Sequence, residues 1–587
     1  MKRRLLSEKR TELLFFIPLF ILCLFLAYQI NFSGRPDRVE INSDKADYYV
    51  YLPATFIYGW DINKFPPGIM DKTHAFVLDY KTNKLIDKTT CGVAILWAPF
   101  FLITHFIAVQ WNLQPDGFSE IYQHMTVLPE VFYLILALLF LRRFLRFYVS
   151  RRLSYITIIL LFAGTNLYFY SIDDGMMSHL NSFFLFSVYL YLLKKFLINE
   201  KKSYGYFCII SFVVAFAILI RPTNILILSW MLFLDVRSFK DLSSRIRLFL
   251  NLMYILTFLL ILFVVFLPQL FYWRYLSGHF VYYSYPGENF ANWKNPRVLS
   301  AWFAPLNGAF LYIPLLLFFV AGFIIMIRNK ITNGIFIGLF FLLISYIFPS
   351  WHSWYFGGSF GYRSFVEYYA LFALPFAYSL GFLGNLKNLY VRSILIFLIL
   401  ASSYYTMRLT YYQRWNTSST WAWDDYLRYL DEVGIYNYPG NSYTFITDFD
   451  NADNTDLFRT RKCFHSPTQG GIVTKNIEYN VIFKRSLHIL LKKPVQRVRA
   501  SIWVNPGNKI KTGILLTILI ENWEHKCYFF KAIKVDDFLK IPDKWAEVTG
   551  SIEIPEWIDQ SNNFVFQVWN PARSDNVYID DVKLRFE

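Results

Sequence analysis

Residues 205–236, GYFCIISFVVAFAILIRPTNILILSWMLFLDV, hold two apolar blocks joined by the polar turn Arg221-Pro222-Thr223-Asn224. Similar blocks recur along the chain, and a helix needs roughly 17–22 apolar residues to cross the hydrocarbon of a bilayer. The chain has 587 residues, of which 55% are hydrophobic, whereas soluble domains lie near 45–50%. The pattern therefore predicts a polytopic α-helical membrane protein.

The apolar blocks predict eleven membrane-spanning helices. They are expected near residues 12–30, 124–141, 153–170, 180–196, 205–220, 222–236, 247–268, 305–327, 332–349, 365–386 and 391–409. Lys and Arg gather between them, for example at Arg142-Arg143 and Arg151-Arg152, within a net charge of +16. Cationic loops mark the cytoplasmic side, whereas a nucleic-acid-binding protein presents its charge as a stripe on one face. We therefore expect a cytoplasmic N-terminus and no nucleic-acid partner.

With this orientation, the extracytoplasmic side receives residues 31–123, 171–179, 269–304, 350–364 and 410–587. The apolar segment 91–109, CGVAILWAPFFLITHFIAV, does not fit as a further span. A full crossing would turn the cluster RRFLRFYVSRR (142–152) outward and invert every later loop, against the charge pattern. We expect this segment to be re-entrant or embedded in the membrane, where protein or a cavity must cover it.

The character of the chain changes near residue 410. Runs such as RVRASIWV, GILLTILIE and VYIDDVKLRF alternate apolar and polar residues, which is typical of β-strands. Several strands at near-regular spacing predict a sandwich. We expect a transmembrane domain at 1–409, a connector at 410–475 and an extracytoplasmic β-sandwich at 476–587. Cys463 and Cys527 can pair only if they lie close together, which the sequence does not show.

Two acidic clusters open the predicted outer loops. Asp44 and Asp47 lie in SDKADYYVY, after the first helix, and a carboxylate there can act as a general base or help to hold a cation. Asp173-Asp174 and the following His179 lie after the helix at 153–170. Acids at a membrane border tend to mark function. The alternatives are solvated loop acids for the first cluster and helix capping for the second.

Cations and aromatic residues accompany the acids. Arg221 suits a lipid phosphate, because its planar fork meets two oxygens, although an arginine that snorkels to the interface has the same position. The aromatic loop 269–297 includes Tyr285 and Glu288, and aromatic rings mixed with polar donors suit a sugar. The motif WHSWYFGGSFGYRS (351–364) adds candidate binding residues and glycines that permit a tight backbone near a ligand. The candidates in it are His352, Trp354 and Arg363.

These motifs resemble the GT-C-fold glycosyltransferases of the protein mannosyltransferase and aminoarabinose transferase type, over roughly residues 10–410. That group opens its first outer loop with an acidic motif, D-E-x-x-Y. Here Asp44 stands four residues before Tyr48, and Lys45 replaces the second acid. The stretches DYYVYLPATFIYGWD, GTNLYFYSIDDGMMSH, RPTN and WYFGGSFGYR are similar to a bacterial branch of the superfamily. The ending VYIDDVKL (577–584) resembles a carbohydrate-binding jelly roll, which either holds an acceptor glycan or serves as a lid.

The resemblance implies an inverting transferase in the bacterial cytoplasmic (inner) membrane. The donor would be a polyprenyl-phosphate sugar, with its phosphate near Arg221 or Arg363, and the acceptor a glycan, lipid or protein hydroxyl. Asp44 would be the catalytic base and Asp47 a second candidate. The other candidate residues would bind substrate. If a divalent cation (Mg²⁺ or Mn²⁺) takes part, Asp44 and Asp174 are its candidate ligands.

Two rival functions have different requirements. A transporter or flippase for lipid-linked glycans would favour charges inside its helices and inverted repeats, and the sequence shows few such charges and no repeat. A non-catalytic scaffold that presents the β-domain gives no reason for carboxylates at each outer loop. The transferase is therefore the preferred interpretation, with the transporter as its alternative.

Overall fold

The structure is a computed structural model that describes residues 2–33, 39–199, 203–285, 288–413, 423–436, 443–447, 458–460, 462–466, 470–487, 497–522, 526–555, 557–558 and 562–586. The chain forms two compact units, Met1–Thr410 (unit 1) and Tyr411–Glu587 (unit 2).

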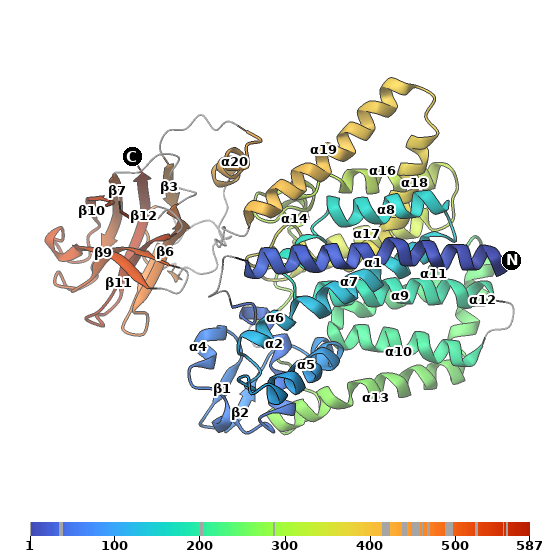
Figure 1. Ribbon diagram of the computed structural model, residues 1–587. Coiled ribbons are helices and arrows are strands. Elements are labelled where there is room, and N and C mark those ends of the chain that lie inside the picture. The colour runs from blue at the N-terminus through green and yellow to red at the C-terminus, as the bar shows by residue number, and fades with distance from the viewer. Residues whose placement is uncertain are drawn as a thin grey trace. The chain divides into compact units, whose positions relative to one another are not determined.

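Unit 1 is a bundle of helices whose long members lie side by side (Figure 1). They are α1 (Lys2–Phe32), α7 (Val127–Leu145), α8 (Arg151–Gly164), α9 (Ser178–Ile198), α10 (Tyr204–Ile220), α13 (Leu252–Ser277), α16 (Leu316–Arg328), α17 (Gly334–Ile347), α18 (Tyr369–Gly384) and α19 (Leu389–Gln413). Their apolar composition favours helices that satisfy every backbone group internally, as a bilayer requires.

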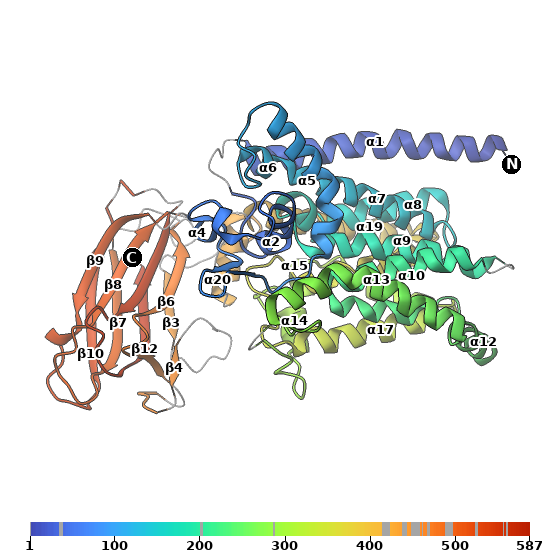
Figure 2. The same cartoon turned by 90° about the horizontal axis from the view of Figure 1, so that it is seen from below.

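The first loop forms a small layer at one end of the bundle, called here the first-loop end (Figure 2). It contains α2 (Ser43–Tyr49), α3 (Tyr51–Phe56), η1 (Ile62–Lys64), α4 (Ile69–Thr73), the hairpin β1 (Val77–Asp79) and β2 (Lys84–Ile86), α5 (Gly92–Gln110) and α6 (Glu120–Met125). Shorter elements connect the later helices. They are the π-helix η2 (Phe169–Asp173), η3 (Pro222–Ser229), α11 (Trp230–Phe233), α12 (Phe239–Phe249), α14 (Val298–Phe303), α15 (Ala309–Tyr312), η4 (Phe348–Ser350) and η5 (Arg363–Phe365).

Three expected spans are interrupted. The span expected at 222–236 is the 3-10 helix η3 followed by α11, and the one expected at 305–327 divides into α15 and α16. Pro314 lies between α15 and α16, where its missing N–H cannot continue a helix. The span expected at 153–170 ends as α8 at Gly164. The number of eleven spans is therefore not confirmed.

Among the described residues, six helices are long and apolar enough to cross a membrane, and five more are apolar but shorter. The six are Glu8–Phe32, Gly92–Gln110, Glu120–Leu145, Ser178–Ile198, Leu252–Ser277 and Leu389–Tyr411. The five are Tyr204–Ile220, Pro222–Phe233, Leu316–Arg328, Gly334–Ser350 and Tyr369–Gly384.

Helix α5 carries the segment expected to be re-entrant. Near its start, a Cβ on Gly92 would lie 2.8 Å from the backbone nitrogen of Ile220, the last residue of α10. Toward its end, the Nδ1 atom of His105 lies 2.6 Å from the hydroxyl of Tyr122 in α6, just before α7 begins. α10 ends and α7 begins at the first-loop end, so α5 contacts the bundle there along its length (Figure 2). Its length alone would allow a crossing, and its depth in a membrane stays a prediction.

A buried ion-pair cluster joins α1 to α7 at the opposite end of the bundle. Glu12 accepts from Arg142, and its second carboxylate oxygen lies 2.6 Å from the guanidinium of Arg143. Arg142 is only 1% exposed. Buried charge is tolerated when it is paired, so the cationic cluster that predicted the orientation also holds two helices together.

Unit 2 is a β-sandwich of two antiparallel sheets, preceded by α20 (Trp423–Glu432). The first sheet has the order β10 (Ala546–Glu553), β7 (Arg497–Asn505), β12 (Val577–Phe586), β5 (Gly470–Val473) and β4 (Arg459–Thr460), and β3 (Tyr443–Thr447) also pairs with β12. The second has the order β6 (Tyr479–Ser486), β11 (Asn563–Trp569), β8 (Leu515–Glu521) and β9 (Cys527–Lys534). Strands β3 to β5 lie within 410–475, the range expected to be a connector.

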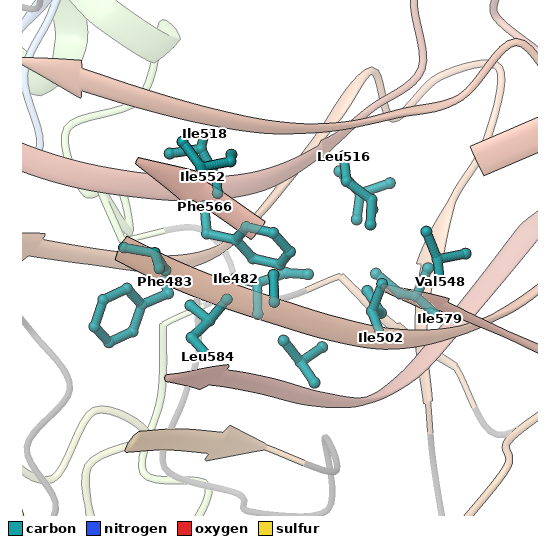
Figure 3. Packing of buried hydrophobic residues seen from close by; sticks show 14 of the residues in the cluster. Ile482, Phe483, Ile502, Leu516, Ile518, Val548, Ile552, Phe566, Ile579 and Leu584 are labelled. Carbon is teal, nitrogen blue, oxygen red and sulfur yellow. The ribbon is translucent and has the colours of Figure 1, made fainter. Parts of the chain in front are cut away.

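The core of unit 2 follows from the period-2 alternation of its strands. In β7 the side chains of Val498, Ala500, Ile502 and Val504 are buried, and the intervening residues 497, 499, 501 and 503 are not. Figure 3 shows inward-facing residues of both sheets packed together, including Ile502. Cys463 and Cys527 are both free thiols, so the pairing considered from the sequence is absent.

Close packing between α16 and α18 gives a stability prediction. A Cβ on Gly322 of α16 would overlap the backbone carbonyl of Pro375 in α18. We expect Gly322→Ala to destabilise unit 1 by about 1–3 kcal/mol through overpacking, read as a lower melting temperature by intrinsic fluorescence. Gly338→Ala is the matched control, because nothing lies within 4 Å of a Cβ there and alanine favours the helix. Equal melting temperatures for the two variants would contradict this packing.

Candidate active site

Asp44 and Arg363 form an ion pair between distant parts of unit 1. Asp44 lies in the first turn of α2, where a helix favours a negative charge. Both terminal nitrogens of Arg363 donate to its Oδ2 at 3.4 Å. The Asp44 side chain is 36% exposed and the Arg363 side chain 18%. A carboxylate that is open to solvent therefore stands beside a partly buried cation.

Lys45 connects α2 to two other acids. Its Nζ atom lies 2.5 Å from Oδ1 of Asp174 and 3.1 Å from Oε2 of Glu40. The backbone N–H groups of Glu40 and Ile41 donate to the side-chain oxygen of Gln123, so this strip of chain is itself held in place. Lys45 thus fixes Asp44 and Asp174 in one region.

A second network surrounds Arg221. Its Nη1 atom lies 3.0 Å from Nδ1 of His179 and 3.4 Å from the hydroxyl of Ser178. His179 also contacts the Glu367 carboxylate at 2.8 Å. The Tyr48 hydroxyl lies 3.0 Å from the Ser178 hydroxyl, which links this network to α2, one turn after Asp44. Arg221 is therefore held by several partners at the first-loop end and is not a free interfacial arginine.

Lys88 is a site residue that the sequence interpretation missed. Its Nζ atom lies 3.6 Å from Oε1 of Glu288 and 5.9 Å from the centre of the Tyr285 ring. Burial lowers the pKa of Lys88, but the carboxylates of Asp44, Glu288 and Asp47 outweigh it and hold the pKa above its ordinary value. The signal for Lys88 was weak, because one lysine in a loop of mixed polarity has no motif around it.

Asp47 differs from Asp44 in its environment. It is 7% exposed. Burial and the nearby Asp44 carboxylate raise its pKa to about 7, although the Phe76 amide donates to it. Asp87, a buried neighbour, also has a raised pKa, because burial and the Asp47 carboxylate both disfavour its charge. Of the two candidate bases, Asp44 is the one that an acceptor can reach.

The remaining candidates form no ion pair with Asp44 in the described part of the chain. The amide of His352 donates to the Asn289 carbonyl at 2.9 Å, next to Glu288. Trp354 is 4% exposed and packs against Tyr355. Asp173 is 2% exposed and belongs to the π-helix η2. Their roles as substrate-binding residues stay predictions.

The donor set for a divalent cation is poor. No group of three or more His, Cys, Asp or Glu side chains suited to a metal occurs in the part of the chain that the structure describes. Asp44 and Asp174, the expected ligands, face Arg363 and Lys45 instead. Fixed cations already neutralise these carboxylates, so we derive no step through a metal.

No protein-family model matches the chain, and no curated protein matches it. Solved structures to which it is similar include the Archaeoglobus fulgidus oligosaccharyltransferase tethered with an acceptor peptide, at 14% identity and TM-score 0.39 over 72% of this chain and 59% of that one. The same enzyme with an inhibitory peptide and a dolichol-phosphate gives 13% identity and TM-score 0.41 over 72% of this chain and 58% of that one.

Arabinosyltransferase EmbB from Mycobacterium smegmatis matches at 10% identity and TM-score 0.34, over 96% of this chain and 64% of that one. Both proteins are GT-C-fold glycosyltransferases, the group that the sequence motifs resemble. The chain spans about three fifths of the length of these proteins.

The raised pKa of Asp47 gives a pH prediction. Between the ordinary value of 3.8 and about 7 the folded protein keeps a proton that the unfolded chain has lost. Stability therefore falls as the pH rises through this window. We expect the melting temperature to drop between about pH 4 and pH 7, and Asp47→Asn to reduce that drop by a few °C.

Asp71→Asn, in the same loop but exposed, is the control and should keep the wild-type dependence. An unchanged pH dependence in Asp47→Asn would show that this carboxyl is not held protonated.

Proposed function

We propose that unit 1 is an inverting glycosyltransferase that moves a sugar from a polyprenyl-phosphate donor to an acceptor hydroxyl on the extracytoplasmic side of a bacterial inner membrane. The observation that carries the proposal is the exposed Asp44 carboxylate beside the Arg363 guanidinium, at the end of an apolar helix bundle. A base and a cation at this distance can serve the attacking and leaving ends of one substitution.

In this proposal Asp44 takes the proton of the acceptor hydroxyl. The acceptor oxygen forms a bond to the anomeric carbon as the bond from that carbon to the phosphate oxygen breaks, and the electron pair leaves with polyprenyl phosphate. Arg363 and Lys88, both close to Asp44, stabilise the charge that develops on the phosphate. Tyr285 and Glu288 are in place to bind the sugar, since both lie beside Lys88.

An apolar cavity beside the site supports a lipid-linked donor. It has a volume of about 590 Å³, within the usual range for ligand sites. Its walls come from α3, α5 and α13 and from nearby residues: Tyr51, Leu52, Thr55, Phe56, Trp60, Cys91, Ala94, Ile95, Ala98, Pro268, Phe271, Tyr272 and Tyr275. Phe56, Ile95 and Phe271 are exposed, so the cavity opens on the surface of the bundle.

The cavity adjoins the polar site. Leu52 and Ala94, which line the cavity, also border a small packing gap against Lys45 and Tyr48. A prenyl chain in the cavity would therefore end close to the charged residues of α2. An apolar cavity next to charged side chains supports a donor with an apolar tail and a phosphate head.

The base is tested with Asp44→Asn in proteoliposomes that contain a labelled polyprenyl-phosphate hexose or pentose. We expect sugar transfer to fall by about 10²–10⁴-fold, the usual worth of general base catalysis, while binding of the donor persists. Asp71→Asn, exposed in the same loop, should keep wild-type activity. Transfer at a near-normal rate in Asp44→Asn would refute the assignment, and donor movement across the bilayer without transfer would favour the transporter.

The cavity is tested with Ala98→Phe, which fills part of it. Each buried methylene group contributes about 0.8 kcal/mol, so the loss of two such contacts raises the KM of a long-chain donor about tenfold or more. A donor with a short prenyl chain should be unaffected, and kcat should change little. Val109→Phe, on the exposed side of α5, is the control. An equal rise in KM for the long-chain and the short-chain donor would show that the cavity does not bind the lipid tail.

A further inference from the structure

Helix α12 (Phe239–Phe249) is stable at the surface because of its N-terminal cap. The Ser238 hydroxyl accepts from the Asp241 amide at 3.2 Å, and the Asp241 carboxylate accepts from the Ser238 amide at 3.1 Å. This reciprocal pair fixes the first turn. None of the eleven residues of α12 is fully buried. An isolated helix of this length is marginal in water, so its environment must contribute to its stability.

The side chains of α12 divide into two faces. At 100° per residue, Phe239, Leu242, Ile246 and Phe249 lie within one apolar arc. Lys240, Ser244 and Arg247 lie on the opposite arc. The C-terminal end of the apolar arc is anchored on the bundle, where the Phe249 ring lies 6.2 Å from the rings of Phe196 and Phe207.

The free end of the apolar arc is exposed. Phe239 is 91% exposed, and Leu250, just past the helix, is 64% exposed. Helix α13, a candidate membrane span, follows directly, and its first residues Leu252 and Met253 are 67% and 61% exposed. The apolar surface of α12 is therefore continuous with a surface that would face lipid. Figure 1 shows α12 at the end of the bundle where α1 begins, the end predicted to be cytoplasmic.

Exposed cations accompany this apolar arc. Arg237, Lys240 and Arg247 are exposed, whereas the one acid of the helix, Asp241, is held in the cap. An amphipathic helix with cations on its polar face lies in the membrane–water interface. Cations at that depth attract anionic headgroups, each by about fivefold in affinity.

We infer that α12 lies in the cytoplasmic membrane interface and binds the phosphate groups of anionic phospholipids through Arg237, Lys240 and Arg247. Phe239 is its apolar anchor. This inference is independent of the proposed transferase activity, because α12 lies at the opposite end of unit 1 from Asp44 (Figure 1).

The first test compares lipid binding by the full-length protein in nanodiscs of phosphatidylcholine with increasing phosphatidylglycerol, read by native mass spectrometry. The triple variant Arg237→Gln/Lys240→Gln/Arg247→Gln should lose at least tenfold in apparent affinity for phosphatidylglycerol. The control variant Lys64→Gln/Lys72→Gln/Lys81→Gln removes the same charge from exposed residues of the first loop and should change it less than twofold. Equal losses in the two variants would overturn the inference.

Inorganic phosphate at matched ionic strength separates the two sources of a phosphate group. If phosphate displaces phosphatidylglycerol from the wild type but not from the triple variant, the site takes free anions and the lipid assignment is wrong. No displacement, together with the tenfold loss, supports the lipid.

The position of the helix has its own readout. Nitroxide labels at Phe239→Cys and Ser244→Cys, in protein that carries Cys527→Ser, lie on opposite faces of α12. We expect the label at 239 to be accessible to oxygen and the label at 244 to a water-soluble nickel complex. If the label at 239 is accessible to the nickel complex and not to oxygen, the interfacial placement is wrong, whatever the native mass spectra show about lipid binding.

Discussion

The ion pair between Asp44 and Arg363 is the contact on which the arrangement of the candidate site depends. It joins residues 319 positions apart. Helix α2 has only seven residues, too few to be stable alone, so polar contacts to the bundle must place it. Lys45 and Tyr48 supply two of these contacts, to Asp174 and Ser178. The Asp44 carboxylate is thus positioned by charged and hydroxyl groups, in addition to the apolar packing of α2.

The same contacts explain how a charged site exists at the end of an apolar bundle. Acids and cations alternate there: Glu40, Lys45 and Asp174 form one group, and Lys88 and Glu288 another. Pairing offsets most of the desolvation cost of each charge. The resting site is close to electrical balance, so an incoming anionic substrate must compete with carboxylates that are already in place.

The sequence predicted the elements of unit 1 better than their continuity. Long apolar runs gave the helices, because burial or lipid favours them all round, but Pro314 divided one of them, and the run expected at 222–236 became the 3-10 helix η3 followed by α11. Loop acids and cations were found because charge is conspicuous beside apolar blocks. Lys88 was missed, since its importance comes from Glu288, 200 residues further along the chain. The alternation of apolar and polar residues predicted the strands of unit 2, because it is a local pattern. A local pattern does not show which strands pair, so it could not predict that β3 pairs with β12.

The pairing of Glu12 with Arg142 and Arg143 has a consequence for biosynthesis. The carboxylate of α1 has its partners only after some 130 further residues have been made. A lone charge within a membrane helix is expensive, so we expect the nascent first helix to wait beside the translocon until α7 emerges, and the two to enter the lipid together. The orientation of α1 in the membrane would then become fixed only when Arg142 and Arg143 neutralise Glu12, well after the first helix has been made.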